Sequence, residues 1–445
     1  MKRMRSVWGV GLTLILIAGC SSGSDDPNNG GVPSALPAGT AQALPLLSVT
    51  TTDSPAPITS KEIYRPADYV LKDESRTVLI QGTTEIRGRG NTTWDLMPKK
   101  PYHLRLTTSS SLLGMPANRH WVLLANYADK TLLRNDITFQ LSRWMGMEYT
   151  SRSKFVEVEL NGTYLGIYQL TEHIRIAPDR VNIPQLKSGD TALSLITGGY
   201  LIEVDSRRDE DFCWDSPRFG IAFCFKDPET LLESGWETRK AYIEQYLRDT
   251  EDAIFGNNFT NPTTGLSYAA YIDVDSLIQY YLVNELVKNI DGALDQSLVQ
   301  SQVYSTYMYK KRDGKLFFGP VWDFDIAMGN LPDPCCAHAD GWHIQKAAWF
   351  TRLFEDPVFA EKVKAKWNQF KANGHLEELF QYIDKQALYL NHVQVKNFQK
   401  WRILSIPVWP FPPDWPVPGS YHGEITAVKN WLRDRINWMD AQFNP

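Results

Sequence analysis

The sequence has no second hydrophobic run of membrane-spanning length, no internal repeat and no excess of positive charge. Its 445 residues carry a formal net charge of -5 at pH 7, so no general positive field holds nucleic acid, and we expect no nucleic-acid partner. Cysteine is scarce, with five residues in the chain. The composition is otherwise that of an ordinary globular protein, with 43% hydrophobic and 22% charged side chains. A chain of this length can bury one large hydrophobic core, or two smaller cores joined through a cleft.

The N-terminus has the pattern of an export signal. Three cations, at Lys2, Arg3 and Arg5, precede an apolar stretch over residues 7–17 that is shorter than the roughly 20 residues of a spanning helix. The stretch ends in LIAGC (residues 16–20), which resembles a bacterial lipobox. We therefore expect a lipoprotein signal peptide over residues 1–19, lipidation of Cys20 and a membrane anchor through that lipid. In the alternative, the signal is cut elsewhere and Cys20 is unmodified.

Residues 20–45 contain Ser, Gly, Asp, Asn, Pro and Ala with almost no large apolar side chain. Such a composition buries too little apolar surface to fold, so it predicts a disordered tether. The folded domain is expected over residues 46–445. Ser21 after Cys20 resembles outer-membrane retention, which predicts a cell-envelope lipoprotein at the outer membrane.

The four other cysteines are an even number in a compartment that permits oxidation, so two disulfides are possible. Cys213 and Cys224 bracket an Asp-Ser-Pro turn and are placed to staple a hairpin. Adjacent Cys335 and Cys336 pair with each other only with strain. For these two, partners elsewhere in the chain or free thiols remain open.

Strand patterns dominate the first part of the folded domain. Alternating and β-branched residues predict strands over residues 77–87, 102–107, 155–160 and 164–170. Asn161-Gly162 lies between the last two and predicts a hairpin, because both residues tolerate the positive φ of a tight turn.

Helical periodicity dominates the later part of the domain. Residues 129–145 form an amphipathic pattern that begins at Asp129 and ends before Gly146, and further helices are predicted over residues 273–290, 357–373 and 425–443. The chain is therefore expected to be α+β, with a β-rich N-lobe over residues 46–175, a helix-rich C-lobe over residues 176–445 and a cleft between them.

Three segments contain groups suited to phosphate and metal chemistry. The first is RGRGNTTW (residues 87–94) followed by PKKPY (residues 98–102). Its glycines let backbone amides approach an anion, and its cations suit a polyphosphate. A β-turn with a solvated basic flank is the competing interpretation.

The second segment is WDFDI (residues 322–326). On a strand, Asp323 and Asp325 share one face about 6 to 7 Å apart, and two buried carboxylates so close need a cation. Oxygen ligands suit Mg²⁺, Mn²⁺ or Ca²⁺.

The third segment is NIDG (residues 289–292), where Asp291 follows a helix end and is placed to accept a proton from a hydroxyl. Turn-capping aspartates explain either segment taken alone.

Together these segments follow an order that phosphoryl transfer uses, in which cations, metal and a positioned base supply most of the stabilisation. With WVLLANY (121–127), LRN (133–135), LNGTYLGIY (160–168), TEH (171–173), GYLIE (199–203) and GPVWDFD (319–325), they resemble successive blocks of the spore-coat protein H (CotH) kinase family. The blocks span about residues 80 to 330.

The resemblance implies an atypical protein-kinase-like, two-lobed fold that transfers phosphate from ATP to Ser or Thr of exported or surface proteins, with Mg²⁺ or Mn²⁺. It implies Asp291 as catalytic base, Asp323 as metal ligand and Asp325 as a second metal residue. It also implies a nucleotide site for which we select Arg89, Asn91, Lys100, Arg105 and Glu172. The chain departs from the pattern at Arg105, where many relatives carry lysine, and it lacks a Gly-rich kinase loop and a His-Arg-Asp tripeptide.

Other segments are assigned structural roles. Cys335, Cys336, His338 and His343 fit no standard zinc spacing, so a disulfide-pinned loop is preferred to a zinc site. Residues 409–416, rich in Trp and Pro, are expected to pack along the C-lobe, with glycan or peptide docking as the alternative. Residues 205–211 are expected to be a solvated loop. The competing function for the whole chain is a catalytically inactive surface binding protein or adhesin on the same fold.

Overall fold

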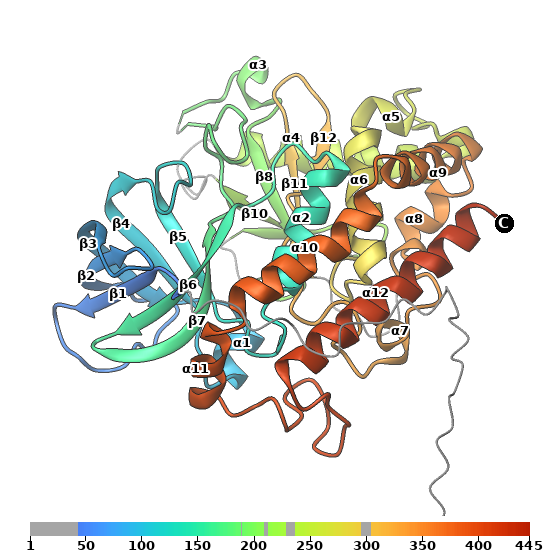
Figure 1. Ribbon diagram of the computed structural model, residues 1–445. Coiled ribbons are helices and arrows are strands. Elements are labelled where there is room, and N and C mark those ends of the chain that lie inside the picture. Colours follow the sequence, from blue (N-terminus) through green and yellow to red (C-terminus); the bar gives the residue numbers. More distant parts are fainter. Residues whose placement is uncertain (1–42, 188, 209–211, 228–235, 295–303) are drawn as a thin grey trace, which may run out of the picture. The chain divides into compact units, whose positions relative to one another are not determined.

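The computed structural model describes residues 43–187, 189–208, 212–227, 236–294 and 304–445 as a mixture of sheets and helices (Figure 1). The expected α+β class is therefore confirmed. The expectations for the signal peptide, Cys20 and most of the tether lie outside the described residues. The two-lobed kinase-like arrangement and its domain boundaries stay predictions.

The first seven strands form a closed barrel in the order β1-β2-β3-β4-β5-β7-β6. Neighbouring strands are antiparallel except β1 and β6, which pair in parallel and close the barrel. Buried side chains from these strands, such as Leu47, Leu104, Trp121 and Leu170, form one hydrophobic cluster. The strands are β1 Leu46–Thr51, β2 Arg65–Lys72, β3 Val78–Gly88, β4 Tyr102–Ser110, β5 Asn118–Leu124, β6 Ser153–Leu160 and β7 Thr163–Glu172.

The hairpin predicted between the last two barrel strands is confirmed. Asn161 and Gly162 have φ angles of 51° and 74°, the left-handed conformation that a two-residue turn requires. The Asn161 side chain also accepts a hydrogen bond from the backbone N–H of Thr51 at 2.9 Å. The turn therefore fixes the register of β6 and β7 and holds the end of β1 beside them.

A second, five-stranded antiparallel sheet has the order β12-β11-β8-β10-β9. Its outer hairpin contains the disulfide between Cys213 and Cys224, so the predicted staple is confirmed. Cys335 and Cys336 are free. The strands are β8 Tyr200–Val204, β9 Cys213–Asp215, β10 Ala222–Asp227, β11 Thr306–Lys310 and β12 Leu316–Phe318.

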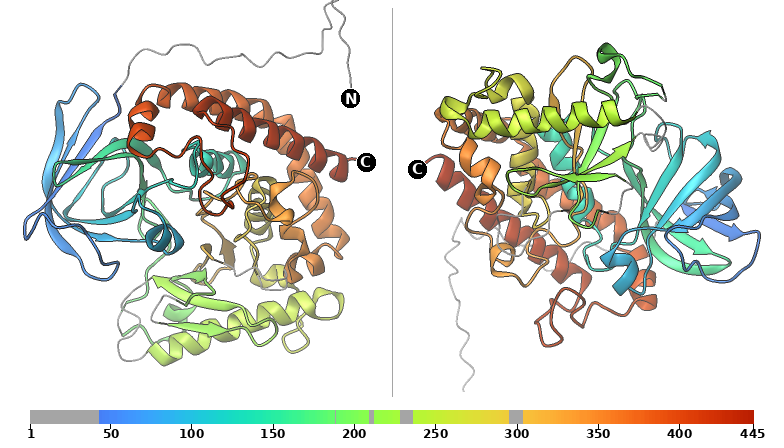
Figure 2. Two further views of the ribbon diagram at one scale, coloured as in Figure 1. Left: turned by 90° about the horizontal axis from the view of Figure 1, so that it is seen from below. Right: turned by 180° about the vertical axis from the view of Figure 1, so that it is seen from behind.

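Most of the helices follow or flank this second sheet, and α10 and α12 run side by side with α6 behind them (Figures 1 and 2). Within the described residues, none of the helices combines the length and apolar character that crossing a bilayer requires. The helices are α1 Thr92–Leu96, α2 Arg134–Met145, α3 Leu193–Ile196, α4 Trp236–Phe255, α5 Tyr268–Tyr271, α6 Val274–Val287, α7 Pro334–Ala337, α8 Ala348–Leu353, α9 Pro357–Ala372, α10 His375–Leu390, α11 Val393–Lys400 and α12 Tyr421–Phe443.

Helix α2 begins five residues later than the sequence pattern predicts. The fully buried Asp129 carboxylate accepts hydrogen bonds from the backbone N–H groups of Thr131 and Arg134, and it pairs with the Arg134 guanidinium at 2.5 Å. Asp129 therefore organises a turn before the helix and does not cap its first residues. The predicted end is confirmed, because Gly146 caps α2 with φ 92°.

Helix α6 begins as predicted, with the Asp273 side chain accepting from the N–H of Ser276. It ends three residues earlier than predicted, at Val287, because Lys288 adopts φ 46°. The Lys288 ammonium donates to the carbonyls of Cys335 and His338, which holds the helix end against α7.

A buried ion pair joins α6 to α12. Glu285 and Arg435 are both fully buried, and a guanidinium nitrogen lies 2.6 Å from the carboxylate. The same carboxylate accepts hydrogen bonds from the backbone N–H groups of His343 and Gln345, each at 2.8 Å. This pair therefore fixes three parts of the chain at one point.

Replacing Arg435 by alanine is expected to lower the free energy of unfolding by about 3–5 kcal/mol, because it leaves the buried Glu285 carboxylate without its counter-charge. Urea denaturation of the wild type and the variant measures the change. Arg433→Ala, which truncates an exposed arginine of the same helix, is the matched control. Equal losses in the two variants would contradict the assignment.

Candidate active site

One cleft of about 540 Å³ contains residues from all three segments that the sequence singled out. These segments are distant in the chain: the turn after β3, the loop after α6 and the loop after β12. The predicted site residues that line the cleft are Arg89, Asn91, Arg105, Asp291, Asp323 and Asp325.

The glycine-containing turn leaves β3 at Gly88 and enters α1. A Cβ at Gly88 would lie 2.2 Å from the Trp94 ring, so glycine is required for the turn to close over that ring. Gly90 has φ 77°, a conformation that other residues rarely adopt. The turn directs Arg89 across the cleft, where its guanidinium lies 5.5 Å from the centre of the Trp322 ring.

Asp291 is held by a network of hydrogen bonds at the end of α6. Its backbone N–H donates to the Asn289 side chain at 3.3 Å, and Asn289 donates to Asn284 at 3.1 Å. A Cβ at Gly292 would lie 2.5 Å from the Asn284 side-chain oxygen. The chain around Asp291 is therefore tightly packed, which fixes the backbone from which its side chain enters the cleft.

The prediction of a strand over residues 322–326 is wrong. Asp323 has φ 68°, which interrupts an extended backbone, and no strand includes these residues. The N–H of Phe324 instead donates to the side chain of Asn135 in α2 at 2.9 Å. The loop still brings Asp323 and Asp325 to the cleft, so both carboxylates reach it from irregular backbone.

The pKa values of all three cleft aspartates are raised. Burial, with the Asp323 charge second, raises the pKa of Asp291 to about 7. Burial also raises the pKa of Asp323, against the nearby cations Arg89 and Arg207, and it raises that of Asp325 together with the Asp323 charge. The carboxylates are therefore close enough to repel, and a bound divalent cation would relieve that repulsion.

Cations line the part of the cleft around these carboxylates. The charge of Arg207 lowers the pKa of Asp323, against the larger effect of burial. The Arg207 guanidinium lies 3.6 Å from the centre of the Tyr304 ring. Lys226 pairs with Glu203 at 2.9 Å, and both line the cleft. Positive and negative walls thus face one cavity, which suits a ligand containing both phosphate and metal.

The prediction that residues 205–211 form a solvated loop is wrong for Asp205, which is buried and lines the cleft. Arg207 and Arg208 are exposed, as predicted, and Arg207 also lines the cleft. The Asp205 side chain accepts the backbone N–H of Arg207 at 2.8 Å, so a local turn holds the arginine at the edge of the loop that borders the cleft. Residues 209–211 lie outside the described residues.

Three histidines form a cluster on the barrel side of the cleft. His103 stacks on His173 with ring centres 4.6 Å apart, and its Nε2 lies 3.2 Å from Nδ1 of His120. Burial, supported by nearby arginines, lowers the pKa of His120 to about 3 and the pKa values of His103 and His173 well below the usual range. The cluster is therefore neutral, and the positive charge of this wall comes from lysine and arginine.

The structure does not bring Lys100 and Glu172 to the cleft lining. The Lys100 ammonium donates to the carbonyl of Trp94 and lies 5.6 Å from the centre of its ring. Glu172 is fully buried and accepts from the Tyr149 hydroxyl and the Arg152 side chain. The two side chains are thus bonded to different neighbours and do not pair with each other.

Several cleft residues received no site role from the sequence. They include Asn126, Asn135, Glu203 and Arg207. The first three lie inside the sequence blocks that resemble the family. Their position as polar residues within those blocks could therefore have identified them as site residues. Arg207 had no such signal, because its place in the cleft lining depends on the turn that Asp205 makes.

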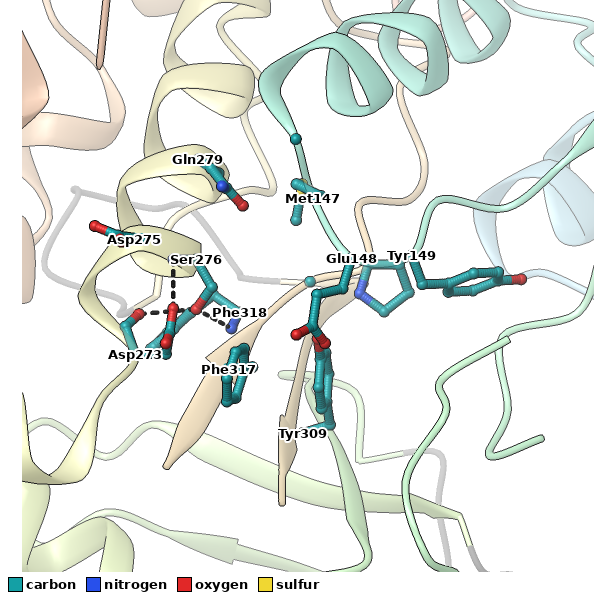
Figure 3. A pocket seen from close by; sticks show the side chains of 13 residues that line it. Met147, Glu148, Tyr149, Asp273, Asp275, Ser276, Gln279, Tyr309, Phe317 and Phe318 are labelled. Carbon is teal, nitrogen blue, oxygen red and sulfur yellow. Dashed lines mark hydrogen bonds between the residues drawn. The ribbon is translucent and has the colours of Figure 1, made fainter. Parts of the chain in front are cut away.

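A smaller pocket of about 180 Å³ lies beside the start of α6 (Figure 3). In it, Glu148 accepts a hydrogen bond from the Tyr309 hydroxyl at 2.7 Å and pairs with Lys311 at 2.6 Å. The described residues that line this pocket include none of the predicted site residues. The large cleft is therefore the candidate active site.

Comparison with known proteins gives one positive result. A protein-family model described as CotH kinase protein matches residues 86–439, which is most of the chain and includes every segment of the cleft described above. No curated protein matches the chain.

Asp291→Asn is expected to stabilise the metal-free protein at pH 8 more than at pH 4.5, by a difference of about 2–4 kcal/mol. The folded-state pKa of about 7 lies above the unfolded value near 4, so the wild type loses stability as pH rises through this window. The asparagine side chain has no proton to lose in this range, so it stays uncharged at both pH values. Urea unfolding in EDTA at both pH values measures the difference.

Asp275→Asn, at an exposed carboxyl of α6, is the matched control and is expected to change little. A difference between Asp291→Asn and the wild type that is the same at both pH values would contradict the assigned pKa.

Proposed function

The chain belongs to the CotH kinase family, and from that premise we propose that it is an extracytoplasmic kinase that transfers the γ-phosphate of ATP to Ser or Thr of exported proteins. The observation that supports this most directly is the convergence of Asp291, Asp323 and Asp325 with arginines in one cleft. In this proposal the barrel is the N-lobe and the helix-rich part is the C-lobe of a kinase-like fold.

The residues of the cleft fit ATP and a divalent cation. Arg89 and Arg207 are cations directed at the carboxylate group, as their lowering effect on the pKa of Asp323 indicates. Arginine forks suit phosphate oxygens, and a neutral histidine cluster beside them adds polar contacts without competing charge. With a volume of about 540 Å³, the cleft falls within the range of small-molecule sites.

Asp323 and Asp325 would hold the metal. Aspartate carboxylates are the ligands that Mg²⁺ and Mn²⁺ prefer, and burial beside another acid makes these two costly without a cation. When bound, a divalent cation neutralises the charge of the phosphate oxygens. Asn126 and Asn135, which hydrogen bond to each other at 3.2 Å, support the loop that holds the two aspartates.

Asp291 would act as the general base. In the reaction, the acceptor hydroxyl oxygen bonds to the γ-phosphorus, the bond from phosphorus to the ADP oxygen breaks, and the hydroxyl proton passes to Asp291. A carboxylate with a pKa of about 7 is suited to take up that proton near neutral pH. Arg89 and Arg207 would stabilise the phosphoryl charge that the transfer redistributes.

Within the nucleotide site, the proposal keeps Arg89, Asn91 and Arg105, which line the cleft. Arg105 pairs with Glu85 at 2.6 Å, so its side chain is already oriented by an acid. Lys100 and Glu172 act in this proposal as structural residues, because each is engaged with neighbours outside the lining.

An extracytoplasmic location is part of the proposal. The Cys213–Cys224 disulfide agrees with a compartment that permits oxidation. The lipobox-like segment ending at Cys20 would anchor the chain to a membrane of the cell envelope, proposed to be the outer membrane, with residues 20–45 as a tether.

Purified protein is expected to transfer labelled phosphate from ATP to envelope proteins when Mg²⁺ or Mn²⁺ is present. Asp291→Asn should lower the rate about 10²–10⁴-fold, because it removes the base, and Asp323→Ala should abolish it. Asp275→Asn, which changes an exposed carboxyl outside the cleft, should leave the rate unchanged. Wild-type rates in both cleft variants would refute the proposal.

A binding protein without turnover is the second candidate, and one observation favours it. A separate pocket of about 240 Å³ lies beside the Trp- and Pro-rich segment and is lined by Phe411, Trp415 and Trp431. Aromatic side chains in such a pocket offer flat apolar faces to a sugar or peptide.

Thermal unfolding with ligands distinguishes the two candidates, because a ligand that binds only the folded state must raise the melting temperature. The kinase is expected to be stabilised by ATP with Mn²⁺, and Asp323→Ala is expected to lose that stabilisation. Stabilisation by an oligosaccharide, with none by ATP and metal, would favour the binding protein.

A further inference from the structure

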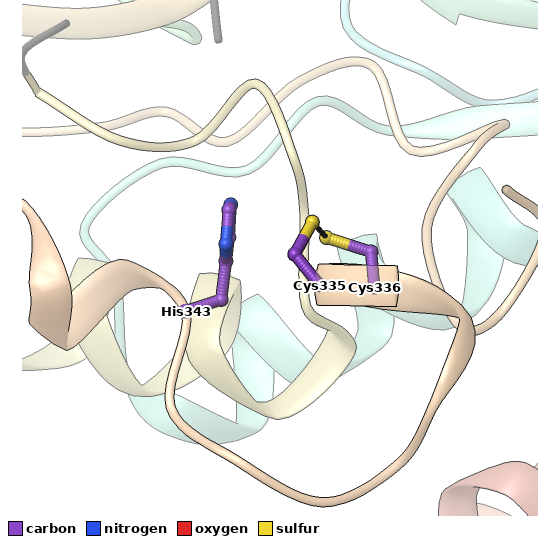
Figure 4. Close-up of side chains that lie close together, drawn as sticks. All are labelled: Cys335, Cys336 and His343. Atoms are coloured by element: carbon purple, nitrogen blue, oxygen red, sulfur yellow. Dashed lines mark hydrogen bonds between the residues drawn. The ribbon is translucent and has the colours of Figure 1, made fainter. Parts of the chain in front are cut away.

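Two free thiols and an imidazole meet close to the loop that contains Asp291. Cys335 and Cys336 lie in α7, and His343 lies in the segment that follows it (Figure 4). The two sulfur atoms are 2.6 Å apart, and the reactive atoms of all three residues lie within 4.8 Å of one another. Nothing in the proposed kinase reaction uses these groups.

The two thiols have different environments. Cys336 is buried, whereas Cys335 is partly exposed. The contact with Cys336 lowers the pKa of Cys335 to about 6, with a further contribution from His343, whereas the same contact raises the pKa of Cys336. Near neutral pH, Cys335 is therefore the accessible nucleophile and Cys336 the protonated thiol behind it.

The distance between the sulfurs favours a covalent bond over a shared metal ion. Two sulfurs that bind one tetrahedral zinc ion at about 2.3 Å each lie about 3.8 Å apart. A disulfide needs about 2.05 Å. From 2.6 Å, closing the bond requires the smaller movement, although the peptide between adjacent cysteines must leave its helical conformation.

We propose that Cys335 and Cys336 form a thiol–disulfide exchange site that is oxidised by a small-molecule or protein disulfide. The Cys335 thiolate attacks one sulfur of that disulfide, and the first partner thiolate leaves. Cys336 then attacks the Cys335 sulfur, the second partner thiolate leaves, and it takes up the proton of Cys336. The chain is oxidised by two electrons to the Cys335–Cys336 disulfide, and the partner disulfide is reduced to two thiols.

The site is mechanically connected to the loop after α6. Lys288, which ends α6, donates to the carbonyl of Cys335 at 2.8 Å, and Nε2 of His343 lies 3.4 Å from the carbonyl of Ile290, the neighbour of Asp291. Closing the disulfide distorts α7 and so displaces an anchor of Lys288. This expectation rests on the proposed kinase function: the oxidised protein should transfer phosphate at a several-fold lower rate than the reduced protein.

The exchange is tested by treating the full chain with oxidised glutathione and mapping the peptide that contains both cysteines by mass spectrometry. The wild type should lose two hydrogen masses in this peptide and become resistant to alkylation, and dithiothreitol should reverse both changes. Cys336→Ser should retain glutathione on Cys335 as a stable mixed disulfide. The matched variant Cys335→Ser should acquire much less.

Three results would overturn the proposal. Both thiols of the wild type could stay open to alkylation, or glutathione could stay on Cys335 of the wild type. Zinc or copper could instead copurify with the protein at one ion per chain and block oxidation, which would make the cluster a metal site.

The activity consequence has its own readout. Phosphate transfer by the oxidised and reduced wild type is compared, with Cys336→Ser kept in reductant as the control for the substitution itself. Equal rates in the two redox states would overturn the connection to Asp291. Absence of transfer in both states would count against the kinase proposal, whereas the mass measurement would still decide the exchange site.

Discussion

Repulsion between three aspartates is the constraint on which the candidate site depends. Asp291, Asp323 and Asp325 reach one cleft from two loops. Burial raises the pKa of each carboxyl, and the Asp323 charge raises the pKa values of Asp291 and Asp325 further. Holding such groups together costs stability unless cations compensate them. The arginines beside them offset part of this cost, and a ligand containing a divalent cation and phosphate would offset the remainder.

The surrounding fold holds these loops where they would otherwise separate. The side chain of Asn135 in α2 accepts the N–H of Phe324, which lies between Asp323 and Asp325. The buried Glu285–Arg435 pair joins α6, α12 and the segment around His343, and Lys288 attaches the end of α6 to α7. Both loops are therefore fixed by buried polar contacts to helices, and the same contacts bring the dithiol close to Asp291.

The sequence predicts elements whose cause is local. The Asn161-Gly162 hairpin, the Gly146 cap and the Cys213–Cys224 staple all follow from a few neighbouring residues, and each is present. The convergence of the glycine-containing turn with Asp291 and Asp323 was expected from the order of family blocks. Those blocks indicate which segments come together, but they do not predict the backbone conformation of those segments.

The sequence fails where a distant contact decides the local conformation. The alternation over residues 322–326 favours a strand, but a hydrogen bond from α2 and the positive φ of Asp323 replace it by a loop. Aspartate is a residue type that commonly caps a helix, but the Asp129 carboxylate instead pairs with the Arg134 side chain. The family resemblance suggests Lys100 and Glu172 for the nucleotide site, but their directions depend on contacts with Trp94 and Tyr149 that the sequence does not reveal.

The most direct test of the account is the position of Mn²⁺ in crystals grown with a non-hydrolysable ATP analogue, located by anomalous scattering. The account predicts a peak in the cleft bound by the Asp323 carboxylate, with the phosphates beside Arg89. A metal bound away from both Asp323 and Asp325, or a cleft that takes up neither metal nor nucleotide, would contradict it.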